Sequence, residues 1–371
     1  MNDWKTVRLG DVCEKGSSNI AQNEITDNNG EYPIYGAAGF IKNVDFYKQE
    51  KPYIGIVKDG AGVGRVSIHP AKSSLIVTMQ YIFPKENIDI KFLAEFLKYQ
   101  NLSRFYTGAT IPHIYFKDYQ NIPLKLPSLQ KQKLISAVLG KCTELIVKNK
   151  TILEKYDTLI KSRFIEMFGD PVLNPKKWNI EKLKTLTSKI GSGATPKGGR
   201  ESYISEGISL VRSMNVYKGY FEYEGLAHIT EDQARELDNV TLQENDVLIN
   251  ITGASVARCC ILPKDVLPAR VNQHVSILRA TEKLNPVYLS NLLITDTEQR
   301  VLLGIGGAGG ATREAITKIE LETLDIPVPP LSLQNDFAAF VQQIDKSKFA
   351  VQKSLEKTEI LYKSLMQAYF G

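Results

Sequence analysis

The feature that most constrains this chain is a short phrase that occurs twice. The stretch IPLKLPSLQ covers Ile122 to Gln130, and IPVPPLSLQ covers Ile326 to Gln334, 204 positions later. Proline lacks an amide hydrogen and holds its predecessor in extended conformations, so each phrase predicts an edge strand that stops before a helix. Ser128 and Ser332 stand where a helix N-cap is expected. The phrase is therefore interpreted as a domain-to-helix junction, written twice.

Other stretches repeat as well. DGAGVGRVSIHP, which begins at Asp59, aligns with TGASVARCCILP, which begins at Thr252, at an offset of 193, and the same offset places Gln80 on Gln273. Short β-branched runs predict strands in each half, and helical patterns follow them at Ile90 to Gln100 and Pro286 to Leu303. A chain of 371 residues also exceeds what one core usually serves. The sequence predicts an α/β protein of two globular units, each followed by a long helix.

Each predicted long helix carries a narrow apolar stripe with steps of three and four residues. In the first helix the stripe comprises Ile135, Val138, Cys142, Leu145, Asn149, Ile152, Tyr156 and Leu159. In the second helix it comprises Phe337, Val341, Ile344, Lys348, Val351, Leu355, Thr358, Tyr362, Leu365 and Tyr369. Such a stripe is typical of a coiled-coil seam, so the two helices are predicted to pair antiparallel, with a buried Asn149 setting the register. The alternative is that each helix packs back on its own domain.

Composition excludes several classes of protein. No segment has the roughly 18 uninterrupted apolar residues of a membrane span, and the first residues, MNDWKTVRLGD, are not a secretory signal, so a cytoplasmic location is expected. The four cysteines form no C-x-x-C pair and the four histidines are scattered, so no metal site is predicted. A net charge of +5 is modest, so any contacts with nucleic acid must be local.

No stretch predicts catalysis. GIGGAGG, from Gly304 to Gly310, contains G-x-G-x-x-G but follows a helical pattern, and a loop near a binding surface is the preferred interpretation over a nucleotide site. TGAT, from Thr107 to Thr110, holds the matching place in the first half. The chain lacks the (Asn/Asp)-Pro-Pro-(Tyr/Phe) and Phe-x-Gly-x-Gly stretches of an amino-methyltransferase. The sequence favours a protein that recognises a binding partner and has no catalytic residues of its own.

The two junctions, the two long helices and the FGDP that closes the first helix at Phe168 to Pro171 resemble the specificity subunit of type I restriction-modification systems. The resemblance implies target recognition domains at 1–128 and 170–330, spacer helices at 129–169 and 331–371, and a pseudo-two-fold repeat whose helices form an antiparallel coiled coil. It implies a non-catalytic chain in which each domain reads one half of a bipartite double-stranded DNA target, while the helices set the gap.

The resemblance also implies partners. Two methylation subunits would dock on the helices and domains, flip an adenine from each half-site and methylate its N6 from S-adenosylmethionine, which this chain itself does not bind. Restriction subunits would complete a nuclease. An assembly scaffold that does not bind DNA is the alternative function, and a complete methyltransferase in one chain is the third hypothesis.

Side chains that read bases or grip phosphates are chiefly Arg, Lys, Asn and Gln, joined by aromatic and hydroxyl groups. Surface loops and strand ends supply the candidates for DNA contact: Lys42, Lys58, Arg65, His113, Tyr115, Lys117, Arg212, Asn215, Lys218, Arg258, Gln273 and Arg313. Arg65 and Arg258 occupy matching places, which favours a shared structural or phosphate role over base reading. Each candidate has a solvated surface role as its alternative.

Overall fold

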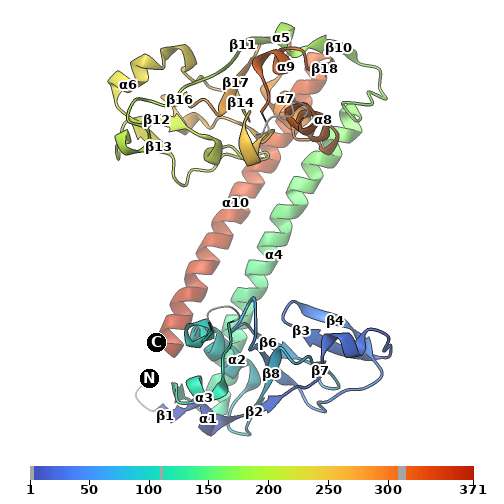
Figure 1. Ribbon diagram of the computed structural model, residues 1–371, viewed down its shortest axis with the longest axis vertical. Coiled ribbons are helices and arrows are strands. Elements are labelled where there is room, and N and C mark those ends of the chain that lie inside the picture. The colour runs from blue at the N-terminus through green and yellow to red at the C-terminus, as the bar shows by residue number, and fades with distance from the viewer. Residues whose placement is uncertain (1–3, 109–111, 308–314) are drawn as a thin grey trace. The chain divides into compact units, whose positions relative to one another are not determined.

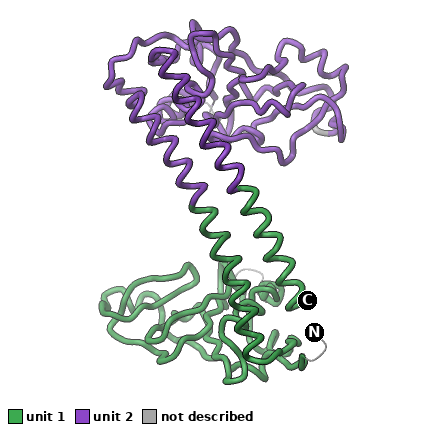
Figure 2. The backbone as a smooth tube through the Cα atoms, turned by 180° about the vertical axis from the view of Figure 1, so that it is seen from behind, with its two compact units in different colours: residues 1–151, 352–371 green, residues 152–351 purple. Residues whose placement is uncertain are grey.

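The computed structural model describes residues 4–108, 112–307 and 315–371. The chain divides into two compact units, residues 1–151 with 352–371 and residues 152–351 (Figure 2). Two helices of 40 residues each, α4 (Leu129–Phe168) and α10 (Leu331–Phe370), contribute to both units (Figure 1). Each helix is about 60 Å long at a rise of about 1.5 Å per residue. Each unit therefore combines one globular domain with the start of one long helix and the end of the other.

The first domain is built from three small sheets. The main sheet has the order β2-β8-β5-β6, with β2 (Cys13–Ser17), β8 (Met79–Pro84), β5 (Tyr53–Val57) and β6 (Val66–His69) all antiparallel. The second sheet has the order β4-β3-β7, with β4 (Gly39–Val44), β3 (Tyr32–Gly36) and β7 (Ser74–Leu75), and β3 pairs with β7 in parallel. The third is the pair β1 (Lys5–Arg8) and β9 (Pro123–Leu126). The helices are α1 (Leu9–Val12), α2 (Ile90–Tyr99) and α3 (Phe116–Tyr119).

The second domain repeats this topology. Its main sheet has the order β11-β17-β14-β15, with β11 (Thr187–Ser192), β17 (Val275–Ala280), β14 (Val247–Asn250) and β15 (Cys259–Ile261). The other sheets are β13-β12-β16, with β13 (Ala227–Ile229), β12 (Ile208–Val211) and β16 (Ala269–Val271), and the pair β10 (Asn179–Lys182) and β18 (Asp325–Val328). Its helices are α5 (Leu183–Leu186), α6 (Glu231–Glu236), α7 (Pro286–Leu293), α8 (Asp296–Gly307) and α9 (Lys318–Glu322). The predicted α/β repeat is confirmed.

The strand registers show how the repeat is spaced. Ile54 pairs with Ile68 and Val247 pairs with Ile261, so the offset between the halves is 193 across the first hairpin. Ile54 also pairs with Ile82, whereas Val247 pairs with Leu278, which makes the offset 196 in the next strand. The second half has therefore gained three residues in between. The predicted equivalence of Gln80 and Gln273 is wrong for this reason, since Gln80 lies in β8 and is buried, while Gln273 is exposed before β17.

One predicted helix is in fact two. The pattern from Pro286 to Leu303 breaks between α7 and α8, where Thr295 accepts a hydrogen bond from the Glu298 amide at 3.3 Å. Gln299 Nε2 donates to the Leu293 carbonyl at 2.7 Å and so satisfies the end of α7. The first glycines of GIGGAGG, up to Gly307, belong to α8, and residues 308–310 lie outside the described residues.

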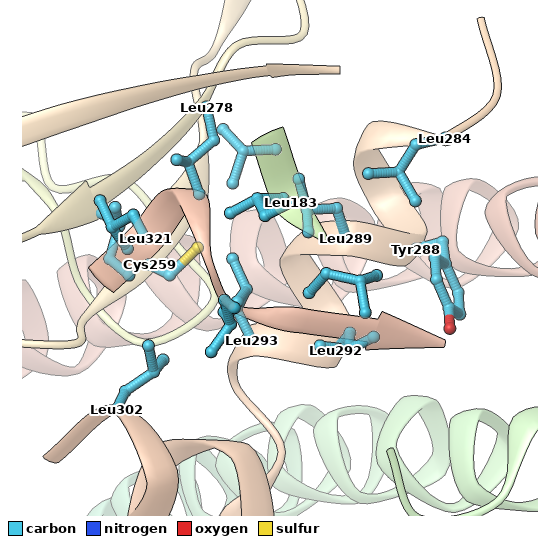
Figure 3. Packing of buried hydrophobic residues seen from close by; sticks show 14 of the residues in the cluster. Leu183, Cys259, Leu278, Leu284, Tyr288, Leu289, Leu292, Leu293, Leu302 and Leu321 are labelled. Carbon is cyan, nitrogen blue, oxygen red and sulfur yellow. The ribbon is translucent and has the colours of Figure 1, made fainter. Parts of the chain in front are cut away.

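Aromatic residues join the helix ends to each domain. In the second unit the Phe168 ring lies 4.7 Å from the Tyr288 ring and 5.5 Å from the Phe337 ring, measured between centroids. Leu284 and the α7 leucines Leu289 and Leu292 lie on one side of Tyr288 (Figure 3). In the first unit Phe370 holds the matching place, with its ring 5.2 Å from that of Phe92. Burial of each such ring contributes about 1.5–3 kcal/mol, so the ends of both helices stabilise the domains they reach.

Two glutamines, whose role the sequence did not indicate, connect the start of each long helix to its domain through hydrogen bonds. Gln132 is fully buried; its Oε1 accepts from the Asp89 amide at 2.7 Å, and its Nε2 donates to the Pro127 carbonyl at 2.8 Å. Gln334 does the same in the second unit, accepting from Asn285 at 2.8 Å and donating to Pro329 at 2.9 Å. The structurally equivalent glutamines, Gln132 and Gln334, are thus 202 positions apart, two fewer than the two copies of the phrase. The predicted cap at Ser332 is wrong, because α10 already begins at Leu331.

We expect Gln132→Ala to lower the free energy of unfolding of the first unit by about 2 kcal/mol, because it leaves buried backbone groups unpaired. Gln130→Ala, at an exposed position two residues earlier, is the matched control and is expected to change it by less than about 0.5 kcal/mol. Urea unfolding followed by circular dichroism measures both variants. Equal effects of the two variants would contradict this role for Gln132.

The two helices pack against each other in opposite directions within each unit. In the first unit Asn149 Nδ2 donates to Ser354 Oγ at 3.3 Å, and Lys150 pairs with Glu359 at 3.0 Å. In the second unit Lys348 pairs with Asp157 at 2.6 Å. Asn149 is buried, as predicted. Both interpretations of the helices hold in part, because the start of each also packs on its own domain.

The burial of α10 follows its predicted stripe, since all of these positions are buried or half-buried: Phe337, Val341, Ile344, Lys348, Val351, Leu355, Thr358, Tyr362, Leu365 and Tyr369. The stripe predicted for α4 needs a correction. Val138, Leu145 and Leu159 are 38%, 47% and 45% exposed, whereas Leu139 and Ile160 are buried. Ile135, Asn149, Ile152 and Tyr156 are buried or half-buried. One of the two rows in α4 therefore lies one residue further along the helix than predicted.

Candidate nucleic-acid interface

The hairpin between β5 and β6, and its counterpart between β14 and β15, is the best-matched feature of the two domains. The Val57 amide donates to the Arg65 carbonyl at 3.0 Å, and the Asn250 amide donates to the Arg258 carbonyl at 2.8 Å. The residue before each arginine, Gly64 or Ala257, has φ of +83° or +67°. A left-handed residue lets the chain reverse tightly, so both arginines leave the hairpin from the same place.

Four predicted residues, Lys58, His113, Tyr115 and Lys117, meet around Asp59 beside the first hairpin, and we name these five residues the Lys58 cluster. Asp59 lies between two of them, with its carboxylate 2.7 Å from His113 Nδ1 and 3.5 Å from Lys58 Nζ. Lys117 Nζ lies 5.3 Å from the centroid of the Tyr115 ring, which is 52% exposed. The Ile114 amide donates to the Lys58 carbonyl at 2.9 Å and holds the two segments together. The cluster presents two cations and an aromatic face.

Lys42 and Arg65 lie apart from these contacts. Lys42 Nζ donates to the Thr26 carbonyl at 2.9 Å, and Arg65 Nη1 donates to the Ala37 carbonyl at 3.0 Å. His69 is excluded as a charged contact, because burial lowers its pKa to about 4 and it stays neutral. The Lys42 and Arg65 side chains therefore make part of their hydrogen bonds around the β4-β3-β7 sheet of the first domain.

A run of tyrosines, which the sequence analysis missed, lies at the second hairpin. We name residues 216–225 the tyrosine loop. Arg258 Cζ lies 4.7 Å from the centroid of the Tyr217 ring, which stacks on Tyr220 at 5.0 Å. Tyr220 is 53% exposed, and partial burial raises its pKa. The signal available in the sequence was VYKGYFEYEG, three tyrosines spaced by three residues beside a lysine.

Lys218, on the same loop, pairs with Asp296 at 3.0 Å, and the hydrogen bond and charge of Lys218 lower the pKa of that carboxyl. Gln273 lies close to a second hydrogen-bonded group, since its Nε2 is 3.2 Å from His274 Nε2 and its Oε1 accepts from Thr195. His274 Nδ1 is 2.6 Å from Thr252 Oγ1. Thr252 holds the place of Asp59, so the same position carries different polar pairs in the two domains.

Two predicted residues are structural. Asn215 is fully buried, and its Nδ2 donates to the Glu222 carbonyl at 2.9 Å, so it shapes the tyrosine loop and cannot reach a base. Arg212 donates to the Gly225 carbonyl and lies 5.2 Å from the centroid of the Tyr203 ring. Arg313 lies outside the described residues. The sequence could not show that a short polar side chain in a glycine-containing loop turns inward.

Groups for metal binding or thiol chemistry are not assembled in the part of the chain that the structure describes. No group of three or more His, Cys, Asp or Glu that could hold a metal ion occurs there. The four cysteines are buried, and burial raises the pKa of Cys13 and Cys260 to about 12, so they remain protonated. No described helix is long and apolar enough to cross a membrane.

Nearly the whole chain matches one known protein family. The family model described as Type I restriction modification DNA specificity domain matches residues 1–155 and 175–361. The chain belongs to this family. The sequence resemblance is thereby confirmed.

Two relatives of this specificity-domain chain align with it over almost their full length. It is 24% identical to the Type I restriction enzyme MjaVIII specificity subunit of Methanocaldococcus jannaschii, over 98% of this chain and 91% of the relative. A putative MjaX specificity subunit from the same organism is 22% identical, over 98% and 92%.

Solved structures share the fold. The crystal structure of the type I restriction-modification S subunit from M. genitalium matches with a TM-score of 0.69 at 14% identity, over 100% of this chain and 96% of that one. A chain from a structural study of the assembly and conformational transition of the type I system matches with a TM-score of 0.54 at 15% identity, over 99% and 97%. At these identities the likeness shows the fold alone.

Proposed function

We propose that this chain is the sequence-specific DNA-binding subunit of a type I restriction-modification complex, in which each domain reads one half of a bipartite double-stranded target. The observation that carries the proposal is the repeated hairpin. Both domains present cations and aromatic rings near this hairpin, but from different segments: residues 58 and 113–117 in the first domain, and Arg258 with the tyrosine loop in the second. Different donors and acceptors on one framework suit two different half-sites, because bases are distinguished by their hydrogen-bonding edges.

Contacts with the DNA backbone and with bases are assigned to different residues. Lys58 and Lys117 hold phosphates, since lysine acts as a compact charge with little geometric preference. Arg258 and Gln273 read bases, because arginine suits guanine and glutamine suits adenine in the major groove. For Arg258 this replaces the role shared with Arg65 that their matching places favoured, because Arg65 donates to the Ala37 carbonyl whereas Arg258 lies on the Tyr217 ring. Tyr217 holds the Arg258 guanidinium through its ring, which orients the donors before DNA binds.

The long helices set the gap between the half-sites and receive two methylation subunits. The exposed apolar row of α4 supports this role, because the helix leaves uncovered the side chains that its own packing does not use. Those residues are Leu134, Val138, Leu145 and Leu159. On α10 the exposed large apolar residues are Leu331, Phe349, Ile360 and Leu361. Apolar side chains of this size are expected on a helix that another subunit covers.

Catalysis belongs to the partners in this proposal. The methylation subunits bind S-adenosylmethionine and transfer its methyl group to adenine N6 after the base is flipped from the stack, while this chain holds the register. Restriction subunits add nuclease activity to the assembled complex. This chain acts before either reaction, by selecting the site.

Salt-dependent DNA binding by the chain in complex with its methylation subunits tests the proposal. Each lost phosphate contact reduces the slope of log affinity against log salt by about one, so Lys58→Ala/Lys117→Ala is expected to reduce it by about two. Lys51→Ala is the control, because Lys51 is exposed before the opposite end of β5. Fluorescence anisotropy on labelled duplex measures both. A slope unchanged by the double variant would contradict this DNA-binding role for the Lys58 cluster.

A further inference from the structure

A buried carboxylate in the second unit is left without a partner. Glu298, in the first turn of α8, is 3% exposed, and its Oε1 has no hydrogen-bond partner among the described residues. Buried carboxylates in folded proteins are normally paired or hydrogen-bonded. None of the interactions assigned above to DNA reading or helix pairing uses the Glu298 side chain. The unpaired Glu298 carboxylate therefore indicates a binding site for a ligand or a partner protein.

Glu298 lines a hollow of about 520 Å³ bounded by α8, α9, β18 and the segment after α4. The walls are largely apolar and include Val172, Ile180 and Val301, and the carboxylates of Glu320 and Asp325 also belong to the lining. No Lys, Arg or His belongs to the lining among the residues that the structure describes. Val172 and Ile180 are 48% and 51% exposed, so the hollow opens onto an apolar surface.

The neighbouring charges do not neutralise Glu298. Burial, and then the charges of Asp170 and Asp325, raise its pKa to about 7. Asp325 itself pairs with Lys182 at 2.6 Å, and Glu320 accepts from the Thr317 amide at 2.7 Å. On the α7 side stands Tyr288, whose hydroxyl donates to the Pro327 carbonyl at 2.7 Å. Among the described residues, the two charges that shift the pKa of Glu298, those of Asp170 and Asp325, are both negative, which favours a cationic occupant.

We propose that this hollow is a docking site for an arginine side chain of a partner protein, with the guanidinium on Glu298 and the methylenes against the apolar walls. A planar guanidinium pairs with a carboxylate through two parallel hydrogen bonds and is less strongly hydrated than an ammonium. Its stem buries well along apolar surface. A bare metal ion fits less well, because no group of three or more metal-ligating side chains is found among the described residues.

The site is specific to the second unit. After α2 the first domain has a short 3-10 helix, Leu102–Phe105. After α7 the second domain has the longer α8 in its place. That helix carries a basic residue, Arg104, in its last turn. The segment that forms one wall includes Pro171 of the FGDP sequence, so the proposal gives this segment a role in binding a partner.

Matched small probes test the proposal on the full chain without DNA. Isothermal titration calorimetry with n-butylguanidinium at pH 8 is expected to show binding, and the neutral isostere n-butylurea is expected to bind at least about tenfold more weakly. Glu298→Gln keeps the shape but removes the charge, and should weaken guanidinium binding about tenfold. Glu231→Gln, on the exposed α6, is the control and should bind as the native chain does.

The pH gives a second readout. Between pH 6 and pH 8 the affinity for n-butylguanidinium is expected to rise about tenfold, because the fraction of Glu298 that is ionised rises by that factor around a pKa of about 7. Equal binding of the two probes, or full binding by Glu298→Gln, would overturn the proposal. Either result would leave the DNA-reading proposal untouched, because no DNA is present.

Discussion

Replacing Arg279 by alanine is expected to lower the free energy of unfolding of the second unit by about 3–5 kcal/mol. Arg279 donates from Nε and Nη2 to the two carboxylate oxygens of Asp246, each at 2.8 Å. The Asp246 side chain is fully buried, so the variant leaves a buried charge without its counter-charge. Urea unfolding of a Trp4→Phe background, in which Trp178 fluorescence reports the second unit, measures the effect.

Arg235→Ala is the matched control for Arg279→Ala. Arg235 also makes an ion pair, with Asp232 at 2.6 Å, but both side chains are largely exposed. Exposed pairs contribute little, so the control should change stability by less than about 1 kcal/mol. Destabilisation by the two variants to the same extent would show that the buried pair does not stabilise the second unit as argued.

The stability of the second unit is expected to fall as the pH rises through about 7 because of Glu298. A carboxyl whose folded pKa lies above its unfolded value of 4.5 binds its proton more tightly when folded. Its contribution is fully present below pH 4.5 and is lost as the pH rises through about 7. At about 1.4 kcal/mol per pKa unit, the loss is about 3 kcal/mol.

Glu298→Gln should therefore be more stable than the native chain by about 2.5 kcal/mol at pH 8 relative to their difference at pH 5. The difference between the two proteins isolates Glu298, because all other titrating groups are shared. Glu231→Gln serves as the control that should show no such pH dependence. The argument fails if the stability difference between Glu298→Gln and the native chain is the same at pH 5 and pH 8.

Periodicity predicted the stripe of α10 fully but that of α4 only in part, for a physical reason. In α4, apolar residues occupy two adjacent rows, such as Val138 with Leu139 and Leu159 with Ile160. At 3.6 residues per turn either row can complete the stripe that passes through Ile135. Tertiary packing chose Leu139 and Ile160, and no local pattern could have shown this.

The candidate site could be predicted only where a residue's position decides its role. Four residues of the Lys58 cluster were among the candidates, because Lys58 follows a predicted strand and the other three lie in a polar surface segment around α3. Asn215 was misjudged because a buried amide that serves a loop has the same sequence signature as an exposed one. Gln132 and Gln334 were missed because their side chains hydrogen-bond to backbone amides that lie far away in the sequence.

The most direct test of the central claim is to co-purify this chain with its methylation subunit and to sequence the N6-methyladenine sites that the complex leaves on genomic DNA. The account predicts a gapped motif with one methylated adenine in each half-site. It further predicts that Arg258→Ala relaxes the sequence of only one half. Failure to form a complex, or methylation without a gapped motif by an active complex, would contradict the account and favour a protein-assembly scaffold.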